Sequence, residues 1–266
     1  MRFTVLTPTF NRAHTLGRLY ESLCAQTLRD FEWVLVDDGS TDNTRETVQS
    51  WNPIFPIRYF WKPNGGKHTA MNMGVREARG EFVAFIDSDD LPVPRALERF
   101  DYRWREIPNP AKFSTCTALT CMPDGTVKGK PFPADFVDAF NFSDQYRYRG
   151  SIDRWGINRT DILREFPFPE GERFVPEGLV WNRMSRKYYT RFFNEPLLIV
   201  HPSSDSLSRR IVDLRASSPK ATLTYYRELA FSPAPARFRL RAAMNFCRFS
   251  VIAARRKIGR VVGKSQ

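Results

Sequence analysis

The sequence predicts an α/β fold, with a mostly parallel central sheet that carries helices on both of its faces. Short apolar runs that suit buried strands alternate with segments of helical period through about residue 95, and such alternation is typical of parallel sheets joined by helices. Acidic residues directly follow two of these runs. A third observation is that residues 231–266 contain nine Lys or Arg and no Asp or Glu. We therefore expect a core over residues 1–210 and a basic helical extension over residues 211–266.

The first half of the core is predicted to contain four strands, each preceded or followed by a helix. Each apolar run is short enough to form a fully buried strand. The runs are Phe3–Leu6, Phe31–Val36, Ile57–Phe60 and Phe82–Ile86. The first helix is indicated by Leu16, Leu19 and Leu23 at helical spacing, and a later one ends before Gly80. Connections in sheets of this kind are right-handed.

Two groups of carboxylates lie where predicted strands leave the sheet. Asp37 and Asp38 follow the second strand, and Asp87, Asp89 and Asp90 follow the fourth. In open α/β sheets the ligand binds outside the carboxyl ends of the strands. Acids this close together suit Mg²⁺ or Mn²⁺, with a phosphate completing the coordination. The alternative interpretation is a solvated acidic turn that caps the following helix.

The pattern is less regular beyond residue 91. We expect a helix over residues 92–104, two strands around an Asp124–Gly125 turn, and a long surface loop over 131–150. Residues 151–157 are expected to return to the sheet, and 159–165 to form a short helix. A loop over 167–177, a helix over 178–188, a strand within 191–201 and a polar loop over 202–209 complete the predicted core.

Composition limits the class of protein. An apolar content of 42% with 14% aromatic residues excludes a disordered chain. The four cysteines form no CxxC pair and no zinc spacing, which favours a reducing compartment. No uncharged apolar run approaches the roughly 18 residues that span a bilayer, and the N-terminus has no long apolar segment. The sequence thus predicts a cytosolic protein.

Four motifs, in order and at characteristic spacing, carry a resemblance to a known family. They are TPTFNR at 7–12, VDDGSTDNT at 36–44, NGGKHTAMNMG at 64–74 and GEFVAFIDSDD at 80–90, with looser matches in PEGLVWNR at 176–183 and HPSSDSLS at 201–208. The chain resembles family 2 glycosyltransferases of the GT-A fold. This resemblance implies a Rossmann-like half over residues 1–95 that binds a nucleoside diphosphate sugar, and a half over 96–210 that binds the acceptor.

The resemblance also implies roles for single residues. Pro8, Thr9, Asn11 and Asp38 would hold the nucleoside, with the Asp38 carboxylate accepting an N–H of the base. Uracil is the base implied, with thymine and guanine as alternatives.

The acidic turn corresponds to the family's DxD motif. Asp87 and Ser88 would lie at the nucleotide, Asp89 closest to Mn²⁺ or Mg²⁺, and Asp90 beside it. His201 is implied near the metal or diphosphate, against the alternative of an ordinary surface or core histidine. Lys67 would approach the nucleotide, against the alternative of a solvated lysine. A divalent cation fits because the departing diphosphate gains negative charge.

The catalytic base is predicted with a departure from the family pattern. Inverting relatives use an acid of an ED pair, whereas this chain offers Glu177–Gly178. We predict Glu177 as the base that takes the proton of the acceptor hydroxyl. The alternative is a first-turn glutamate favoured by the helix dipole. Asp153 and Glu172 are the other candidates for the base.

The function implied is metal-dependent, inverting hexosyl transfer from a nucleoside diphosphate sugar to a glycan or lipid-linked acceptor, in cell-surface polysaccharide synthesis. One alternative is a sugar nucleotidyltransferase, but TPTFNR lacks the glycines of that class. Another is a non-catalytic relative that binds only nucleotide or membrane.

The basic extension is predicted to form an amphipathic helix over residues 235–264. Its apolar stripe includes Leu240, Met244, Cys247 and Val251. We expect it to bind the anionic inner face of a membrane. A partner protein, or packing of the helix on the core, are the alternatives. Nucleic acid is not expected as a partner, because no recognised binding module accompanies the charge.

Overall fold

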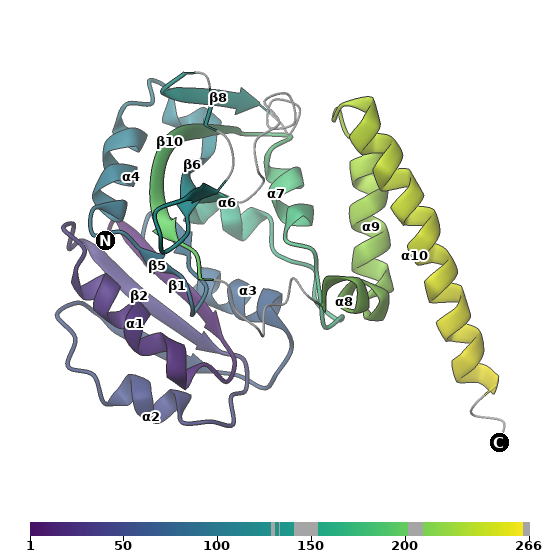
Figure 1. Ribbon diagram of the computed structural model, residues 1–266, viewed down its shortest axis with the longest axis horizontal. Coiled ribbons are helices and arrows are strands. Elements are labelled where there is room, and N and C mark those ends of the chain that lie inside the picture. Colours follow the sequence, from purple (N-terminus) through teal and green to yellow (C-terminus); the bar gives the residue numbers. More distant parts are fainter. Residues whose placement is uncertain (129–130, 133, 141–153, 202–209, 263–266) are drawn as a thin grey trace.

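A computed structural model describes residues 1–128, 131–132, 134–140, 154–201 and 210–262, with side chains through residue 256. One sheet of ten strands forms the centre, in the order β3-β2-β1-β4-β9-β6-β10-β5, with β7 paired to β6 and β8 to β10 (Figure 1). Helices cover this sheet, and three C-terminal helices stand beside it. The α/β prediction is therefore confirmed.

The N-terminal half of the sheet is parallel. Its strands are β1 (Phe3–Thr9), β2 (Phe31–Asp37), β3 (Ile57–Trp61) and β4 (Phe82–Phe85). The helices between them are α1 (Ala13–Cys24), α2 (Thr44–Gln49) and α3 (Lys67–Glu77). All four predicted strands are present, and β1, β2 and β3 extend past their expected ends by one to three residues. The carboxyl ends of β1 and β2 thus carry Thr9 and Asp37 directly to the edge where the site forms.

Alternate residues of each strand enter two separate cores. Val5 and Trp33 pack with α1 on one face, whereas Leu6 and Val34 pack with α3 on the other. Helix α3 lies very close to β1: a Cβ atom added to Gly74 of α3 would fall only 1.7 Å from Cδ1 of Leu6 in β1. Glycine at that position therefore allows α3 to bring its N-terminal loop to the site.

The C-terminal half of the sheet is mixed. Strand β9 (Arg154–Arg159) runs antiparallel between β4 and β6 (Phe113–Cys121), and β10 (Tyr189–Ile199) lies parallel to β6. Strands β5 (Leu91–Pro92), β7 (Val127–Lys128) and β8 (Phe136–Phe140) pair antiparallel at the margins. The parallel arrangement seen over residues 1–85 does not continue here.

One element of this half corrects the sequence analysis. The loop expected over residues 131–150 contains strand β8, whose residues pair with Tyr189–Phe193 of β10. Arg191 of β10 is buried and forms an ion pair with Asp138 of β8 at 2.7 Å. This long-range pair supports a strand that has little apolar alternation of its own. Residues 141–150 lie outside the described part of the chain.

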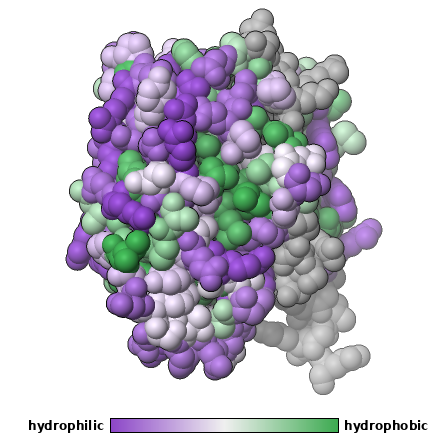
Figure 2. Space-filling view, turned by 60° about the vertical axis from the view of Figure 1, so that its left-hand side comes forward, coloured by the Kyte–Doolittle hydropathy of each residue, from purple (hydrophilic) through white to green (hydrophobic). Residues whose placement is uncertain are grey.

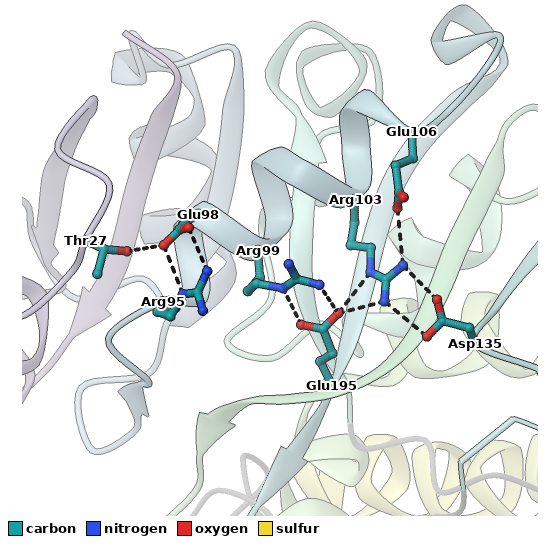
Figure 3. Close-up of polar contacts among 8 residues, drawn as sticks. All are labelled: Thr27, Arg95, Glu98, Arg99, Arg103, Glu106, Asp135 and Glu195. Atoms are coloured by element: carbon teal, nitrogen blue, oxygen red, sulfur yellow. Dashed lines mark hydrogen bonds and ion pairs between the residues drawn. The ribbon is translucent and has the colours of Figure 1, made fainter.

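Helix α4 (Ala96–Arg105) is fixed to β10 by ion pairs (Figure 3). Arg99 contacts both carboxylate oxygens of Glu195, at 2.6 and 2.7 Å, and Arg103 contacts the same carboxylate at 2.9 Å. Arg103 also binds Asp135 at 2.8 Å. The remaining short helices of this half are η1 (Pro110–Lys112), α6 (Thr160–Glu165) and α7 (Gly178–Met184).

The extension forms three helices, α8 (Ile211–Ser217), α9 (Pro219–Ala230) and α10 (Ala236–Val262). Helix α10 packs on α9 through Ala242 and Phe249, and the Phe249 ring stacks on Tyr226 at 5.7 Å. The predicted apolar stripe is not this packed face, since Leu240 and Met244 are 64% and 65% exposed. The predicted helix is confirmed, but its phenylalanines pack inward and its expected stripe faces outward.

The exposed surface is largely hydrophilic. On the face in Figure 2, hydrophilic side chains surround a smaller group of apolar ones near the middle. Among the described residues, no helix is long and apolar enough to cross a membrane.

Candidate active site

A cleft of about 1570 Å³ opens at the carboxyl ends of the strands. The residues predicted to bind the nucleotide or the metal line this cleft, apart from Asn11, and so does Glu177. Segments as distant as Pro8, Glu177 and His201 therefore meet in one cavity. The wall is completed by α8, α9 and the first turns of α10, which contribute Arg215, Tyr225 and Arg241.

Asn11 lies beside the cleft and ties two loops together. Its backbone has a positive φ of 53°. Its side-chain oxygen accepts the N–H of Thr41 at 2.8 Å, and its own N–H donates to the Ser40 hydroxyl at 2.8 Å. The structure thus gives Asn11 a positioning contact with the loop after β2. Thr9, in contrast, lines the cleft with a buried hydroxyl that has no hydrogen-bond partner among the described residues.

Asp38 organises the glycine-rich loop before α3. Its two carboxylate oxygens accept the backbone N–H groups of Gly65 and Gly66, at 2.9 and 2.8 Å. Lys62 donates to the same carboxylate at 2.5 Å. Gly66 has a φ of 99°, and a Cβ there would fall 2.4 Å from the carbonyl oxygen of Arg173. The sequence analysis did not identify Lys62, which follows β3 without a motif of its own.

Asp37, the neighbour of Asp38, stabilises the turn that follows β2. It accepts the N–H of Ser40 at 2.7 Å and the hydroxyl of Tyr59. Burial and the hydrogen bond to Asp37 raise the pKa of Tyr59 above its usual value. The two neighbouring acids therefore have different tasks, since Asp37 fixes the turn and Asp38 lies on the cleft.

Lys67 links the acidic turn to the predicted base. Its ammonium lies 2.7 Å from Asp87 Oδ1 and 2.9 Å from Glu177 Oε1. Burial opposes the charge on this lysine, but attraction to Asp87 and Glu177 outweighs it and raises the pKa of Lys67 above its usual value. Lys67 is therefore a cation held between the two halves of the site by two ion pairs.

The acidic turn, residues 87–90, and His201 offer oxygen and nitrogen atoms that could bind a metal ion. Asp90 Oδ1 accepts the backbone N–H of His201 at 3.2 Å, and the buried His201 Nδ1 has no partner among the described residues. No three His, Cys, Asp or Glu side chains of the described residues are grouped closely enough to hold a metal by themselves. Mg²⁺ sites in nucleotide enzymes often use only one or two carboxylates plus substrate phosphates. The residues present fit a cation of that kind.

Glu177 occupies the N-terminus of α7 on the opposite wall. Its side chain is 42% exposed and makes no capping hydrogen bond. Glu172, the second candidate, is engaged elsewhere, because its oxygens accept the N–H groups of Lys220 and Ala221 at the start of α9, at 3.0 and 2.6 Å. Asp153 lies outside the described residues. Of the two described candidates, only Glu177 presents a carboxylate to the cleft.

His68 is a cleft residue that the sequence analysis passed over. It is 3% exposed, and its Nε2 has no partner among the described residues. Burial lowers the pKa of His68 below its usual value. No sequence signal marked it, because it sits inside a helix motif where a buried histidine and a solvated one look alike.

The N-terminal region matches a known protein family. Residues 4–109 match the model of the family described as glycosyl transferase family 2. The uncharacterised glycosyltransferase YibD of Escherichia coli is 34% identical over 172 residues, which cover 61% of this chain and 49% of that protein. The chain thus spans about half the length of that relative.

Solved structures share the fold. Staphylococcus aureus TarS 1–349 in complex with UDP gives a TM-score of 0.66 at 20% identity, covering 93% of this chain and 71% of that one. A mannosyltransferase from Pyrobaculum calidifontis in complex with GDP-Man and Mn²⁺ gives 0.59 at 20% identity, covering 92% and 69%. At this level of identity the likeness shows the fold alone, and it confirms the predicted GT-A architecture.

Proposed function

We propose that this chain, whose residues 4–109 belong to glycosyl transferase family 2, transfers a hexose from a nucleoside diphosphate sugar to a glycan or lipid-linked acceptor, with inversion. The observation that carries the proposal is the meeting of the acidic turn, Asp38 and Glu177 in one cleft, with Lys67 joining the two walls. Residues 1–95 would form the donor half and residues 96–210 the acceptor half.

The donor is proposed to lie against the ends of β1 and β2. Thr9 offers a buried hydroxyl without a partner, and Asp38 Oδ2 accepts one N–H from Gly66, which leaves it able to accept another from a base. The UDP bound by S. aureus TarS and the GDP-Man bound by the P. calidifontis enzyme support a nucleotide donor of this class. We propose UDP as the nucleotide, as the sequence resemblance implies.

Asp89, Asp90 and His201 are proposed to hold Mn²⁺ or Mg²⁺. A divalent cation, when bound, would offset the charge on the departing diphosphate. The chain's own contribution is to orient the acidic turn: the backbone N–H of His201 fixes Asp90, and the ion pair with Lys67 fixes Asp87. The Mn²⁺ in the P. calidifontis enzyme is consistent with this role.

Glu177 is proposed as the base. Its carboxylate lies on the cleft and is oriented by Lys67, so it can accept a proton from an acceptor hydroxyl that faces the sugar. Trp181, one turn further along α7, packs on Phe85, with 5.8 Å between the two ring centres, and lines the same cleft. An aromatic ring there gives the acceptor sugar an apolar face to pack on.

The direct test is a panel of nucleotide sugars incubated with the protein and Mn²⁺, with release of nucleoside diphosphate followed over time. We expect slow hydrolysis of one donor, and a rise in melting temperature with its nucleotide that requires the metal, because a ligand that binds only the folded state stabilises it. Absence of both would overturn the proposal in favour of a non-catalytic relative.

A membrane site is proposed for α10, through residues 235–264, at the inner face of a membrane. The exposed Leu240, Met244 and Val251 support it, as does the excess of basic residues in this segment. Co-sedimentation with anionic vesicles at physiological salt tests it. Protein that stays in the supernatant there, with Leu240→Glu behaving like the parent, would contradict it.

A further inference from the structure

The charges that line the cleft are segregated. The acidic residues on the described walls are Asp38, Asp87, Asp89, Asp90 and Glu177, all assigned above to the donor, the metal or the base. Away from the donor motifs, Glu177 is the one acidic residue of the described lining, against six Lys or Arg: Lys128, Arg154, Arg173, Arg215, Arg237 and Arg241. A cleft that bound a neutral acceptor would gain nothing from this excess of positive charge.

Three of these arginines come from the C-terminal helices. Arg215 lies on α8, with its guanidinium 5.8 and 5.3 Å from the ring centres of Tyr225 and Tyr226. Its buried Nε has no hydrogen-bond partner among the described residues. Arg237 and Arg241 are one turn apart on α10, and neither forms an ion pair with a described carboxylate. Their charges are therefore available to a ligand in the cleft.

This basic wall lies on the side of the proposed base. Gly178, directly after Glu177, is so close to α9 that a Cβ on it would fall 3.0 Å from the Tyr225 ring. The same ring lies under the Arg215 guanidinium. The wall thus adjoins the position where an acceptor hydroxyl would meet Glu177.

Resting on the proposed glycosyl transfer, we propose that the acceptor is a phosphorylated molecule, and that Arg215, Arg237 and Arg241 bind its phosphate. Guanidinium groups pair with phosphate through two parallel hydrogen bonds. Phe238 and Leu214 line the same part of the cleft, so the group next to the phosphate is offered apolar contacts. The basic extension is on this account part of the acceptor site.

The test uses the full chain with UDP and Mg²⁺ at saturation, so that the donor end is filled, and titrates inorganic phosphate by calorimetry. We expect Arg237→Gln/Arg241→Gln to weaken phosphate binding by about tenfold or more. The matched control is Arg248→Gln/Arg255→Gln, which removes the same charge from α10 outside the cleft lining and should change affinity by less than about twofold. Arg215→Gln should give a similar loss to the first pair, and Arg215→Lys a smaller one.

A second arm separates a lipid phosphate from a free one, using phosphatidylcholine vesicles with and without phosphatidic acid. If the cleft variants lose affinity for inorganic phosphate, the ligand is a water-soluble phosphate. If they lose affinity only for the phosphatidic acid vesicles, the ligand is a lipid headgroup. Either result supports the proposal. In the titration with inorganic phosphate, equal loss in the control pair overturns the proposal, and so does unchanged affinity of the cleft pair for both ligands. The control pair is not compared on vesicles, because Arg248 and Arg255 lie in the segment proposed to bind membrane. UDP affinity is measured in each variant: if UDP binds and the affinities for inorganic phosphate and for the phosphatidic acid vesicles are both unchanged, this inference fails alone, whereas failure of UDP to bind counts against the proposed function.

Discussion

The two walls of the cleft are built in different ways. On the donor wall, Thr9, Asp38 and Asp87 lie at or just after strand ends, and Asp38 is fixed by the backbone N–H groups of Gly65 and Gly66. On the acceptor wall, side chains come from α7 and from the C-terminal extension, and they are placed by contacts between distant segments, such as that of Gly178 with Tyr225. Local sequence therefore determines the first wall, and tertiary packing determines the second. Lys67 is the contact between them.

The largest expected effect is on the donor wall. Asp89→Ala should abolish transfer and donor hydrolysis, because Asp89 is proposed as the residue closest to the metal. Asp89 is only partly buried and belongs to neither apolar core, so the melting temperature without ligand should change by only a few degrees. Donor turnover and thermal unfolding measured on one preparation check both parts. Near-normal turnover would remove the acidic turn from the mechanism.

Glu177→Gln should impair catalysis at the acceptor wall and leave donor binding intact. We expect kcat to fall by about 10²- to 10⁴-fold, the usual contribution of a general base, with UDP affinity nearly unchanged. If turnover survives while thermal stability drops, Glu177 is instead a helix residue favoured by the dipole of α7. Glu172→Gln is the matched control, since its carboxylate binds backbone N–H groups of α9 and should affect stability more than turnover.

Lys67→Met should affect both walls, by about ten- to a hundredfold in kcat/KM. In the parent the raised pKa of Lys67 keeps it charged throughout the assay range. Its removal leaves Asp87 and Glu177 without the cation that orients both carboxylates. Both the KM for the donor and kcat should therefore worsen, and initial-rate kinetics measure the two separately. A change in only one of them would contradict this linking role.

The sequence could predict the donor wall because its signals are local. The four strands and the residues at their ends follow from apolar runs and adjacent acids, and the structure differs by a few residues at most. It could not predict β8, since Asp138 meets Arg191 across more than fifty positions of sequence. Periodicity indicated the apolar stripe of α10 that contains Leu240 and Met244, which faces outward. It did not indicate that Ala242 and Phe249 would pack on α9. Period alone cannot tell which of two apolar stripes finds a partner.

Removing the ion pairs of α4 should change stability and leave the donor wall intact. Glu195→Gln is expected to cost about 2 kcal/mol at neutral pH, since two partly buried arginines lose their carboxylate. Against the effect of burial, hydrogen bonds from Arg99 and Arg103 lower the pKa of Glu195 below its usual value of 4.5. A carboxyl group with a lowered pKa stabilises the fold above its unfolded pKa, and this contribution is lost as pH falls through the folded one.

The difference between parent and Glu195→Gln in the free energy of unfolding should therefore be complete at pH 7 and shrink below about pH 4.5. Urea unfolding across that range measures it. The control is Glu98→Gln, whose exposed pair with Arg95 (Figure 3) should give a much smaller difference. UDP affinity should match the parent in both variants above pH 6, because neither residue lines the cleft. A loss of UDP affinity in Glu195→Gln would mean that the ion pairs of the acceptor half also shape the donor wall, and that the two walls are not built independently.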